Sequence, residues 1–265
     1  MDVTEYLRAT AQGAQAPSLI FLNQLIERHL AQFPFSSVNV LLGNELSLDD
    51  GPLFERVVEQ RRGGYCFEHN KIFSSVLEQL GFNVRTLMAR VSYNGPLTNP
   101  RTHRVILLSL EGEEYLVDVG FGPLGPCGAV KLLSPNKTQL FGSSFRVERL
   151  DDEYYLQVLR GEGYFTLYVV DLSRYTEKDC ELGHFFSHRH PNAVFVNNLI
   201  VSKIEQGRVC HIRNTSFFRE ADREVDSINS PEELGAILRD HFDMLLTTED
   251  VAQLYVKAKA KDLPS

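Results

Sequence analysis

Cys66 stands in a sequence context that suits a nucleophilic thiol. It follows the consecutive glycines Gly63 and Gly64, and it opens a stretch whose apolar residues recur at helical spacing. Two glycines permit a tight turn and a close approach of the backbone. The free N–H groups and the macrodipole at a helix start favour an anion, which is one way in which proteins stabilise a thiolate. For a cysteine considered alone, a buried structural role is the alternative.

A histidine and an aspartate on two successive predicted strands could assist this thiol. His103–Leu110 and residues 114–119 have the alternating pattern of strands, and Glu111-Gly112 between them suits a two-residue hairpin turn. Such a turn makes His103 a diagonal neighbour of Asp118, at about 7–8 Å between backbones. A slip of the register by a single residue would instead put the two side chains on opposite faces of the sheet.

A cysteine, a histidine and an aspartate can together perform covalent acyl transfer. The thiolate attacks an acyl carbon, the imidazole moves protons, and the carboxylate orients the imidazole and stabilises its charged form. The candidate catalytic residues are therefore Cys66, His103 and Asp118. The same residue types also serve hydrolases of the papain and transglutaminase kinds, so these residues alone leave the reaction open.

The elements that must position these residues change in kind along the chain. In the first third, one helix ends before Pro34, a second covers residues 52–60, and a third begins near Cys66. The apolar period then changes to two, and strands are predicted at residues 84–91, 103–110, 114–119, 145–150, 154–159 and 165–170. Six short strands in series predict an antiparallel sheet or a barrel.

The last part of the chain mixes strands and helices. Residues 193–203 and 209–214 have strand character. Pro231–Phe242 has helical spacing, with Ser230 at the N-cap position and the proline at the first helical position. A final helix is predicted over residues 249–259. Helices, then strands, then a mixed segment predict a fold of the α+β class.

Composition limits the possible partners. Hydrophobic residues make up 43% and charged residues 23%, which argues against disorder. The formal net charge of −8 makes the chain a poor general binder of nucleic acid. No apolar run approaches the roughly 18 residues of a membrane helix, and the first residues lack the pattern of a signal peptide. We therefore expect a cytoplasmic protein with neither a nucleic-acid nor a membrane partner.

The remaining cysteines and histidines do not predict a metal site. The four cysteines are scattered without a CxxC pair, so neither a disulfide framework nor a zinc ribbon is indicated. A zinc site could be imagined from Cys66, His69, His188 and His190, but nothing in the sequence brings these residues together. We expect reduced cysteines and no bound metal.

Three segments around the candidate residues resemble motifs of the arylamine N-acetyltransferase family. Residues 62–70, Arg-Gly-Gly-Tyr-Cys-Phe-Glu-His-Asn, resemble the nucleophile motif of that family. Residues 101–105, Arg-Thr-His-Arg-Val, resemble its histidine strand. Residues 115–122, Tyr-Leu-Val-Asp-Val-Gly-Phe-Gly, resemble its aspartate strand and the loop that follows. The three segments occur in the order of the family, and the likeness extends over the whole chain.

The resemblance implies a fold and a reaction. The implied parts are an N-terminal helical bundle over residues 1–83, a central antiparallel β-barrel over residues 84–187 and a C-terminal α/β lid over residues 188–265, with a cysteine-protease-like Cys-His-Asp core. Acetyl-CoA is the implied co-substrate, with no other cofactor. In the implied ping-pong reaction an acetyl group passes from acetyl-CoA to Cys66, and then to the nitrogen of an arylamine or hydrazine.

The resemblance also implies contacts with the two substrates. The family places four aromatic side chains at the acceptor pocket, namely Phe35, Phe67, Phe121 and Phe195. Flat apolar walls suit an aromatic amine, although core packing is the alternative for any phenylalanine. The glycine-rich loop after Asp118 has backbone amides that could contact the CoA pyrophosphate, and the residues expected to bind CoA are Gly122 and Pro123.

Neighbouring residues and other functions complete the expectations. We expect an ion pair between Arg62 and Glu68 to hold the turn before Cys66. His69 shares the helix face of Cys66, but the strand histidine is the base in the family.

An amide synthase that closes a macrolactam and a ligand-binding module with a decayed site are the other interpretations. The acceptor amine, the acyl-chain preference and the oligomeric state stay open.

Overall fold

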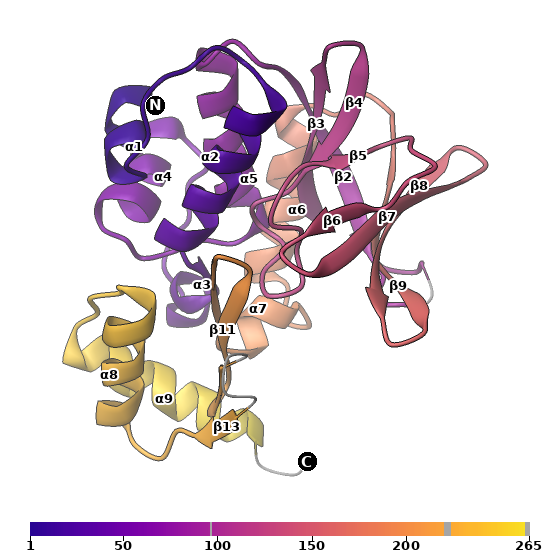
Figure 1. Cartoon of the computed structure of the whole chain (residues 1–265). Helices are drawn as coiled ribbons and strands as arrows, with labels where there is room; N and C mark the ends of the chain where they lie inside the picture. The colour runs from indigo at the N-terminus through magenta and orange to yellow at the C-terminus, as the bar shows by residue number, and fades with distance from the viewer. Residues whose placement is uncertain (96, 220–223, 263–265) are drawn as a thin grey trace.

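The computed structural model describes residues 1–95, 97–219 and 224–262. Figure 1 shows helices near the amino terminus, a curled sheet beside them, and a smaller sheet with two helices near the carboxyl terminus. The predicted order of helices, strands and a mixed segment is therefore confirmed, and the fold combines α and β structure.

Four of the amino-terminal helices pack around one apolar core. They are α1 (Val3–Ala9), α2 (Leu19–Gln32), α4 (Asp50–Phe54) and α5 (Cys66–Gln79), whereas Val38 and Leu41 of α3 (Val38–Leu42) are buried in the apolar core of the carboxyl-terminal part. Helix α2 ends before Pro34 as predicted, and its apolar stripe is buried. The predicted helix over residues 52–60 occurs, but α4 ends at Phe54 and passes into a π-helical turn at Glu55–Glu59. The wider turn buries the adjacent residues Val57 and Val58 together.

Eight strands form the antiparallel sheet that carries the candidate histidine. They are β2 (Asn83–Val91), β3 (His103–Leu110), β4 (Glu113–Val117), β5 (Val130–Lys131), β6 (Thr138–Leu140), β7 (Ser143–Leu150), β8 (Glu153–Arg160) and β9 (Gly163–Asp171). Their order across the sheet is β5-β4-β3-β2-β9-β8-β7-β6. The six predicted strands all occur. Strands β5 and β6 were missed because two or three residues are too few for a period-two pattern.

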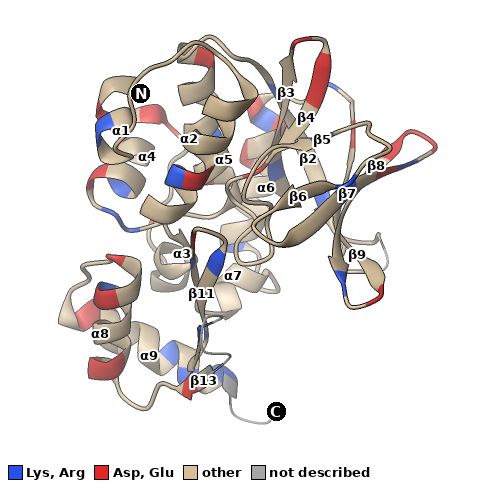
Figure 2. Ribbon diagram, in the orientation of Figure 1, with Lys and Arg blue, Asp and Glu red and all other residues tan. Residues whose placement is uncertain are grey.

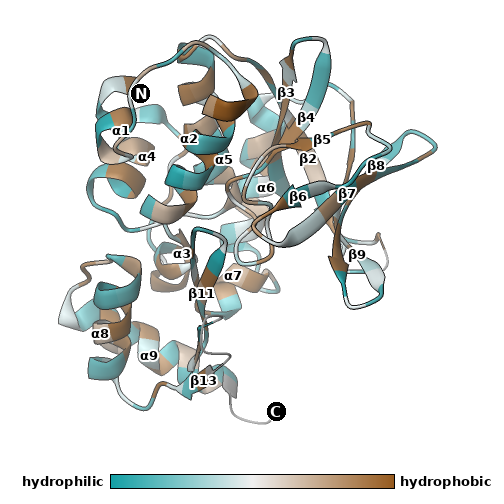
Figure 3. Ribbon diagram, viewed as in Figure 1, coloured by the Kyte–Doolittle hydropathy of each residue, from teal (hydrophilic) through white to brown (hydrophobic). Residues whose placement is uncertain are grey.

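This sheet curls into a near-closed barrel. Strand β5 pairs with β4 and also lies close to β7, near the other end of the sheet. The curled sheet encloses an apolar core that includes Leu87, Leu107 and Leu156. Figure 3 shows hydrophobic segments along the strands and hydrophilic residues at the hairpin turns. Within the described part of the chain the edge strands β5 and β6 do not pair with one another, so hydrogen bonds do not close the predicted barrel.

The hairpin between β3 and β4 has the predicted register. Leu110 lies opposite Glu113, and Ile106 lies opposite Val117. The two turn residues between the strands have φ angles of 53° and 81°, as in the type I′ turn that matches the twist of antiparallel strands. Asp118 therefore follows β4 at the end of the sheet where β3 begins with His103.

The carboxyl-terminal part is built around a second antiparallel sheet. Its strands are β1 (Phe35–Ser36), β10 (Ile200–Glu205), β11 (Arg208–Arg213), β12 (Ser216–Arg219) and β13 (Glu224–Ser227), in that order. Helices α8 (Pro231–Phe242) and α9 (Thr248–Asp262) share an apolar core with this sheet. The hydroxyl of Ser230 caps α8 as predicted, and the final helix is confirmed.

Two segments of this part differ from the prediction. The expected strand over residues 193–203 is wrong in its first half, where α7 (Val194–Asn197) precedes β10. Asn197 and Asn198 bond their side chains to nearby carbonyls, which favours the helical turn over an extended chain. Helix α6 (Glu177–Arg189) was not predicted, and the expected boundary between residues 187 and 188 falls within it.

Charged residues are spread over the outside of the molecule. Figure 2 shows acidic residues along α8 and at the β3–β4 and β7–β8 turns, whereas lysines and arginines are scattered. The view contains no continuous basic face among the described residues. None of the helices in the described ranges combines the length and the hydropathy that crossing a membrane requires.

Candidate active site

The turn before Cys66 is held against the strand β1. Ser36 N–H donates to the carbonyl of Gly64 at 2.6 Å, and Gly64 N–H donates to the carbonyl of Pro34 at 3.4 Å. Gly63 has a φ of 66°, and a Cβ at this position would lie 2.7 Å from the Pro34 oxygen. Only glycine therefore suits Gly63, and the turn delivers the chain to the start of α5.

Cys66 is the first residue of α5 and is buried, with 3% of its surface exposed. The helix start is secured by Glu68, whose carboxylate accepts from the N–H of Tyr65 at 3.1 Å. Burial raises the pKa of Glu68, and the guanidinium of Arg56, 2.6 Å from its carboxylate, opposes that effect. The thiol is thus placed at the positive end of a capped helix.

The expected ion pair between Arg62 and Glu68 is wrong. Glu68 pairs with Arg56, which comes from the π-helical turn. Arg62 instead donates to Asn39 Oδ1 at 3.1 Å and to Asp250 Oδ2 at 3.1 Å. Helix α5 turns Glu68 inward and away from the preceding loop, so two different acidic partners serve the two arginines.

His103 and Asp118 form a buried pair. Nε2 of His103 lies 2.6 Å from Oδ2 of Asp118, and their side chains are 3% and 0% exposed. Burial on its own lowers the pKa of His103. The charge and hydrogen bond of Asp118, with a hydrogen bond and charge from Cys66, outweigh burial and raise the pKa to about 10. The imidazole is therefore held in its charged form at neutral pH.

The pair also determines which ring nitrogen faces the thiol. Because Nε2 of His103 donates to Asp118, Nδ1 is the ring nitrogen left for an interaction with Cys66. In its thiol form, Cys66 Sγ can also donate to the carbonyl of Thr102 at 3.7 Å. The structure thus brings Cys66, whose charge acts on His103, beside the hydrogen-bonded pair of His103 and Asp118, and these three residues form the series discussed below.

The loop after β4 approaches the start of α5 very closely. A Cβ at Gly120 would lie 2.7 Å from the Cα of Cys66, so a side chain at this position would collide with the helix backbone. The N–H of Gly120 donates to Oδ1 of Asp118 at 2.9 Å. Asn70 of α5 donates to the same oxygen at 2.8 Å. Helix α5 and the Asp118 loop are therefore joined directly.

Aromatic side chains surround the series on two sides. The rings of Phe121 and Tyr168 lie 5.3 Å and 5.1 Å from that of His103. On the other side, one apolar cluster contains Cys66 with Phe35 and Phe67, and Phe195 packs against it. Phe67 is fully buried, whereas Phe195 is partly exposed. All four predicted phenylalanines thus lie near the series, with Phe121 separate from the other three.

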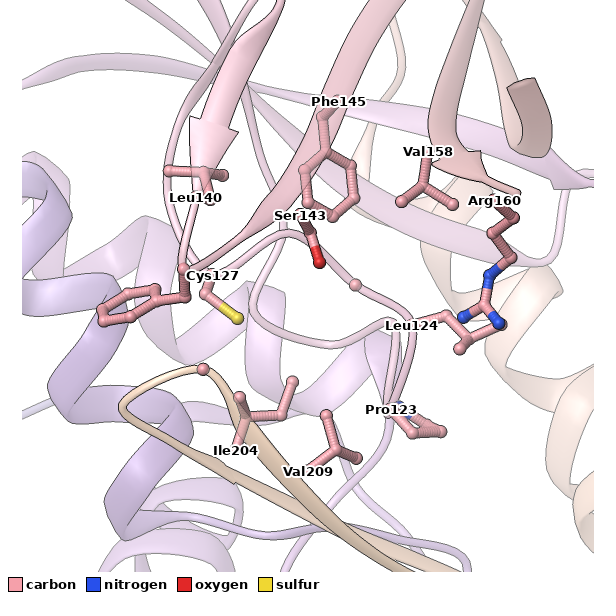
Figure 4. A pocket seen from close by; sticks show the side chains of 13 residues that line it. Pro123, Leu124, Cys127, Leu140, Ser143, Phe145, Val158, Arg160, Ile204 and Val209 are labelled. Atoms are coloured by element: carbon pink, nitrogen blue, oxygen red, sulfur yellow. The ribbon is translucent and has the colours of Figure 1, made fainter. Parts of the chain in front are cut away.

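A pocket lies beside the loop that follows Asp118. It has a volume of about 460 Å³ with its open mouth included, and Figure 4 shows the side chains that line it. Pro123 and Leu124 of the loop form one wall, and Ile204 and Val209 of the β10–β11 hairpin form another. Arg160 is the only charged side chain among the lining residues. Pro123 therefore lines a cavity, whereas Gly122 lies against the ring of Phe35.

His69 belongs to a separate buried chain of hydrogen bonds. Tyr6 Oη lies 2.8 Å from His29 Nδ1, and His29 Nε2 lies 2.8 Å from His69 Nδ1. His69 Nε2 lies 3.2 Å from the carbonyl of Pro34. Because this carbonyl can only accept, His69 donates to it, His29 donates to His69, and Tyr6 donates to His29. Both histidines are neutral in this arrangement, and neither nitrogen of His69 is left for a proton transfer at Cys66.

Metal ligands do not gather in the described residues. No group of three or more histidine, cysteine, aspartate or glutamate side chains there could hold an ion. The imagined zinc set is not assembled, because His69 is bonded in the chain above and His188 Nδ1 lies 2.6 Å from the carbonyl of His184.

The similarity of this chain to known proteins shows first that it is of the N-acetyltransferase class and then which family within that class it belongs to. A family model described as N-acetyltransferase matches residues 18–251. The arylamine N-acetyltransferase of Escherichia coli strain K12 is 33% identical over 90% of this chain and 87% of its own. The chain belongs to the arylamine N-acetyltransferase family.

Solved structures of relatives agree with this assignment. An arylamine N-acetyltransferase from Salmonella typhimurium matches with a TM-score of 0.91 and 28% identity, over 96% of this chain and 97% of that one. The Mycobacterium marinum enzyme, solved in complex with CoA, matches with a TM-score of 0.90 and 26% identity, over 97% and 99% of the two chains. The family resemblance inferred from the three motifs is thus confirmed.

Sequence reasoning missed two residues next to Asp118. Asn70 lay within the nucleophile motif, and its spacing of four residues from Cys66 put it on the same helix face, but no role was assigned to it. Tyr168 comes from β9, the strand that pairs with β2 in the middle of the sheet. Its approach to His103 depends on the pairing of β9 with β2, in which Val170 lies opposite Ala89 and Ala89 opposite His103, and the sequence did not reveal this pairing.

Proposed function

We propose that this protein transfers an acetyl group from acetyl-CoA, through a thioester on Cys66, to the nitrogen of an arylamine or hydrazine. The observation that carries the proposal is Cys66 beside the hydrogen-bonded pair of His103 and Asp118 in a chain of the arylamine N-acetyltransferase family. Its thiol, imidazole and carboxylate correspond in kind to the core of a cysteine protease.

In the first half-reaction the acetyl group moves to the enzyme. The Cys66 thiolate, paired with the imidazolium of His103, attacks the thioester carbon of acetyl-CoA. The tetrahedral intermediate collapses with cleavage of the bond to the CoA sulfur, and Nδ1 of His103 gives its proton to the departing thiolate. The products are CoA and acetylated Cys66, with a neutral imidazole still bonded to Asp118.

In the second half-reaction the acceptor takes the acetyl group. The amine nitrogen attacks the carbonyl carbon of the thioester, and the neutral Nδ1 of His103 removes a proton from that nitrogen. Cleavage of the C–S bond releases the amide and returns the thiolate of Cys66 beside the imidazolium. Asp118 stabilises that positive charge throughout and keeps the ring in one orientation.

The start of α5 offers donors for the oxyanion of both steps. The N–H groups of Cys66 and Phe67 are in the first turn of the helix, where backbone donors have no acceptor within the helix. Preorganised backbone donors of this kind stabilise the charge that develops on a carbonyl oxygen. We assign the oxyanion to this turn.

The two substrates approach from different sides of Cys66. Phe35 and Phe195, with ring centroids 5.7 Å apart, supply flat apolar surface for an aromatic acceptor, backed by the buried Phe67. Phe121 adjoins His103, with its ring 5.3 Å from the imidazole. Acetyl-CoA lies along the loop of Gly122 and Pro123, where the guanidinium of Arg160 supplies positive charge for phosphate groups. The relative solved with CoA supports this co-substrate.

The proposal is tested by following the enzyme itself. Incubation with acetyl-CoA in the absence of amine should add one acetyl group, which mass spectrometry of the intact protein and its peptides locates at Cys66. Cys66→Ala should remove both this label and the turnover of an arylamine. Labelling at Cys127, Cys180 or Cys210 in its place would overturn the assignment. Release of acetate at the rate of amide formation would indicate a hydrolase instead.

The division into residues 1–83, 84–187 and 188–265 and the cytoplasmic location stay predictions. Limited proteolysis near residues 83 and 187 would test the first, and fractionation of cells that express the protein would test the second.

A further inference from the structure

Asn70 is a buried polar residue that the reaction outlined above does not use. It lies in α5 four residues after Cys66, so it sits one helical turn farther along the same face. None of its surface is exposed. A buried amide is costly unless its donors and acceptor are paired, so its contacts indicate what holds it there.

The amide of Asn70 is bonded in a single possible orientation. Its Nδ2 donates to Oδ1 of Asp118 at 2.8 Å and to the carbonyl of Arg104 at 2.7 Å. Its Oδ1 accepts from the N–H of Val119 at 3.0 Å. A flipped amide would face two oxygens with its own oxygen, so the nitrogen must point to the carboxylate.

The two oxygens of Asp118 have different hydrogen-bond partners. Oδ1 accepts from Asn70 and from the N–H of Gly120, which are both neutral donors. Oδ2 is left to face Nε2 of His103 at 2.6 Å. Burial and the charge of the nearby Asp118 raise the pKa of Tyr168, whose buried hydroxyl makes no hydrogen bond with the described residues. With Oδ1 anchored, the carboxylate cannot turn away from the imidazole.

We propose that Asn70 is a positioning residue that aims the Asp118 carboxylate at His103, an inference that rests on the role proposed above for these two residues. Cys66 and Asn70 belong to one rigid helix. The helix that carries the nucleophile therefore also sets the place of the carboxylate, and through it that of the imidazole. Asn70 touches neither the thiol nor a substrate, and it acts through Asp118.

The histidines and tyrosines around Asp118 do not titrate near neutral pH, so the role of Asn70 can be tested by the pH dependence of a variant. They are Cys66 and His69 of α5, His103 of β3, Tyr168 of β9 and Tyr93 of the β2–β3 loop. Burial lowers the pKa of His69 to about 4, and the pKa of His103 is about 10. Burial raises the pKa of both tyrosines above 10.0. Neither imidazole nor phenol titrates between these limits.

The test is Asn70→Asp, which keeps the size of the side chain and adds a proton-dependent charge. Two carboxyls that share one buried site retain one proton at low pH. The protonated variant can donate its single O–H to Oδ1 of Asp118 and still accept from Val119 N–H, although the carbonyl of Arg104 loses its donor at every pH. When that proton is lost, the two carboxylates repel one another and Asp118 loses the donor as well. The variant should therefore work best at low pH.

The measured quantity is the single-turnover rate of Cys66 acetylation by acetyl-CoA, for variant and natural protein at the same pH. We expect the ratio of the two rates to fall at least about tenfold between about pH 5 and pH 8. A ratio that stays constant over this range would overturn the proposal, whatever its value. If the natural protein is not acetylated at Cys66 at any pH, the proposed function fails instead.

Two further variants keep the outcome unambiguous. Asn214→Asp is the matched control, because Asn214 is also buried and bonded, to Leu199 N–H at 3.1 Å and to Asn198 at 3.2 Å, but lies in the turn between β11 and β12 of the second sheet. Its rate ratio should not depend on pH. Asn70→Ser is too short to reach Asp118 and should lower the acetylation rate at least about tenfold at every pH, with an unchanged KM for acetyl-CoA. A folded Asn70→Ser protein with the natural rate would contradict the proposal.

Discussion

Two buried histidines of this protein differ in charge, although water reaches neither of them. His103 lies at the end of the curled sheet, and its pKa is raised to about 10. His69 lies in the helical part, and burial lowers its pKa to about 4. The difference comes from the partner. His103 faces the carboxylate of Asp118, whereas His69 has the neutral ring of His29 on one side and a carbonyl on the other. Burial removes the charge of an imidazole unless an anion is buried with it.

The two histidines also contribute to the site in different ways. The chain of Tyr6, His29 and His69 ends at the carbonyl of Pro34, which in turn accepts from Gly64 in the turn before Cys66. It braces the turn without carrying a charge. The pair of His103 and Asp118 holds a charge beside the thiol, where a proton must move during the reaction. The imidazole of His69 thus stabilises the structure around the site, whereas that of His103 takes part in the reaction.

The same substitution at both histidines should produce the largest contrast. His103→Gln removes the proton carrier, so we expect acetylation of Cys66 to fall at least about 10³-fold. His69→Gln leaves that group in place, so acetylation by the folded protein should stay within about threefold of the natural rate. Rapid-quench mass spectrometry of both variants measures this contrast. Equal losses in two folded variants would contradict the division of roles.

Asp118→Asn should make His103 resemble His69. An amide in place of the carboxylate removes the anion that outweighs burial, so the imidazole loses its charge and its preferred orientation. In a serine-protease triad the corresponding change costs about 10⁴-fold in rate, and we expect a loss here of at least about 10²-fold. The acetylation rate of Cys66, with circular dichroism as the folding control, provides the test. Near-natural acetylation would leave a Cys66–His103 pair without the carboxylate.

The two histidines should also give opposite dependences of stability on pH. The folded pKa of His69, about 4, lies below its unfolded value of about 6.5, so the unfolded chain binds a proton that the folded chain does not. The free energy of unfolding should therefore fall by about 3 kcal/mol between pH 6.5 and pH 4 through this group. His103 contributes stability that is present below about pH 6.5 and is lost as the pH rises through about 10.

Urea unfolding at several pH values measures both contributions. The difference in unfolding free energy between the natural protein and His69→Gln should change over the acid range, because other titrating groups are common to both proteins and cancel. The difference in unfolding free energy between the natural protein and His103→Gln should change only at alkaline pH. Parallel curves for all three proteins would show that neither histidine has a shifted pKa in the folded state.

The smallest expected effect concerns the Tyr168 hydroxyl, which lies near Asp118 without bonding to it. Tyr168→Phe removes a buried hydroxyl, but Asn70 and Gly120 still anchor the carboxylate. We expect a loss of acetylation of about threefold to tenfold, because the carboxylate loses a nearby hydroxyl dipole that favours its charged form. An acetylation rate equal to that of the natural protein would show that the Tyr168 hydroxyl does not act on Asp118.

Local sequence determined a large part of the site. The Gly63-Gly64 turn and the start of α5 follow from residues within a few positions of Cys66. The pairing of β3 with β4 follows from the two-residue turn at Glu111-Gly112, because such a turn permits only one register. That register is enough to put His103 near Asp118. The three motifs also identified the family, since each consists of neighbouring residues.

Only the tertiary structure decided which distant groups meet. Glu68 pairs with Arg56 and not with Arg62, because a helix and a π-helical turn bring them together. Phe35 joins the second sheet through β10, far along the chain. Asn70 reaches Asp118 because α5 packs on the end of the curled sheet. Short-range turns and helix starts are set by local backbone preference, whereas these contacts depend on the packing of whole elements, which no single segment of the sequence encodes.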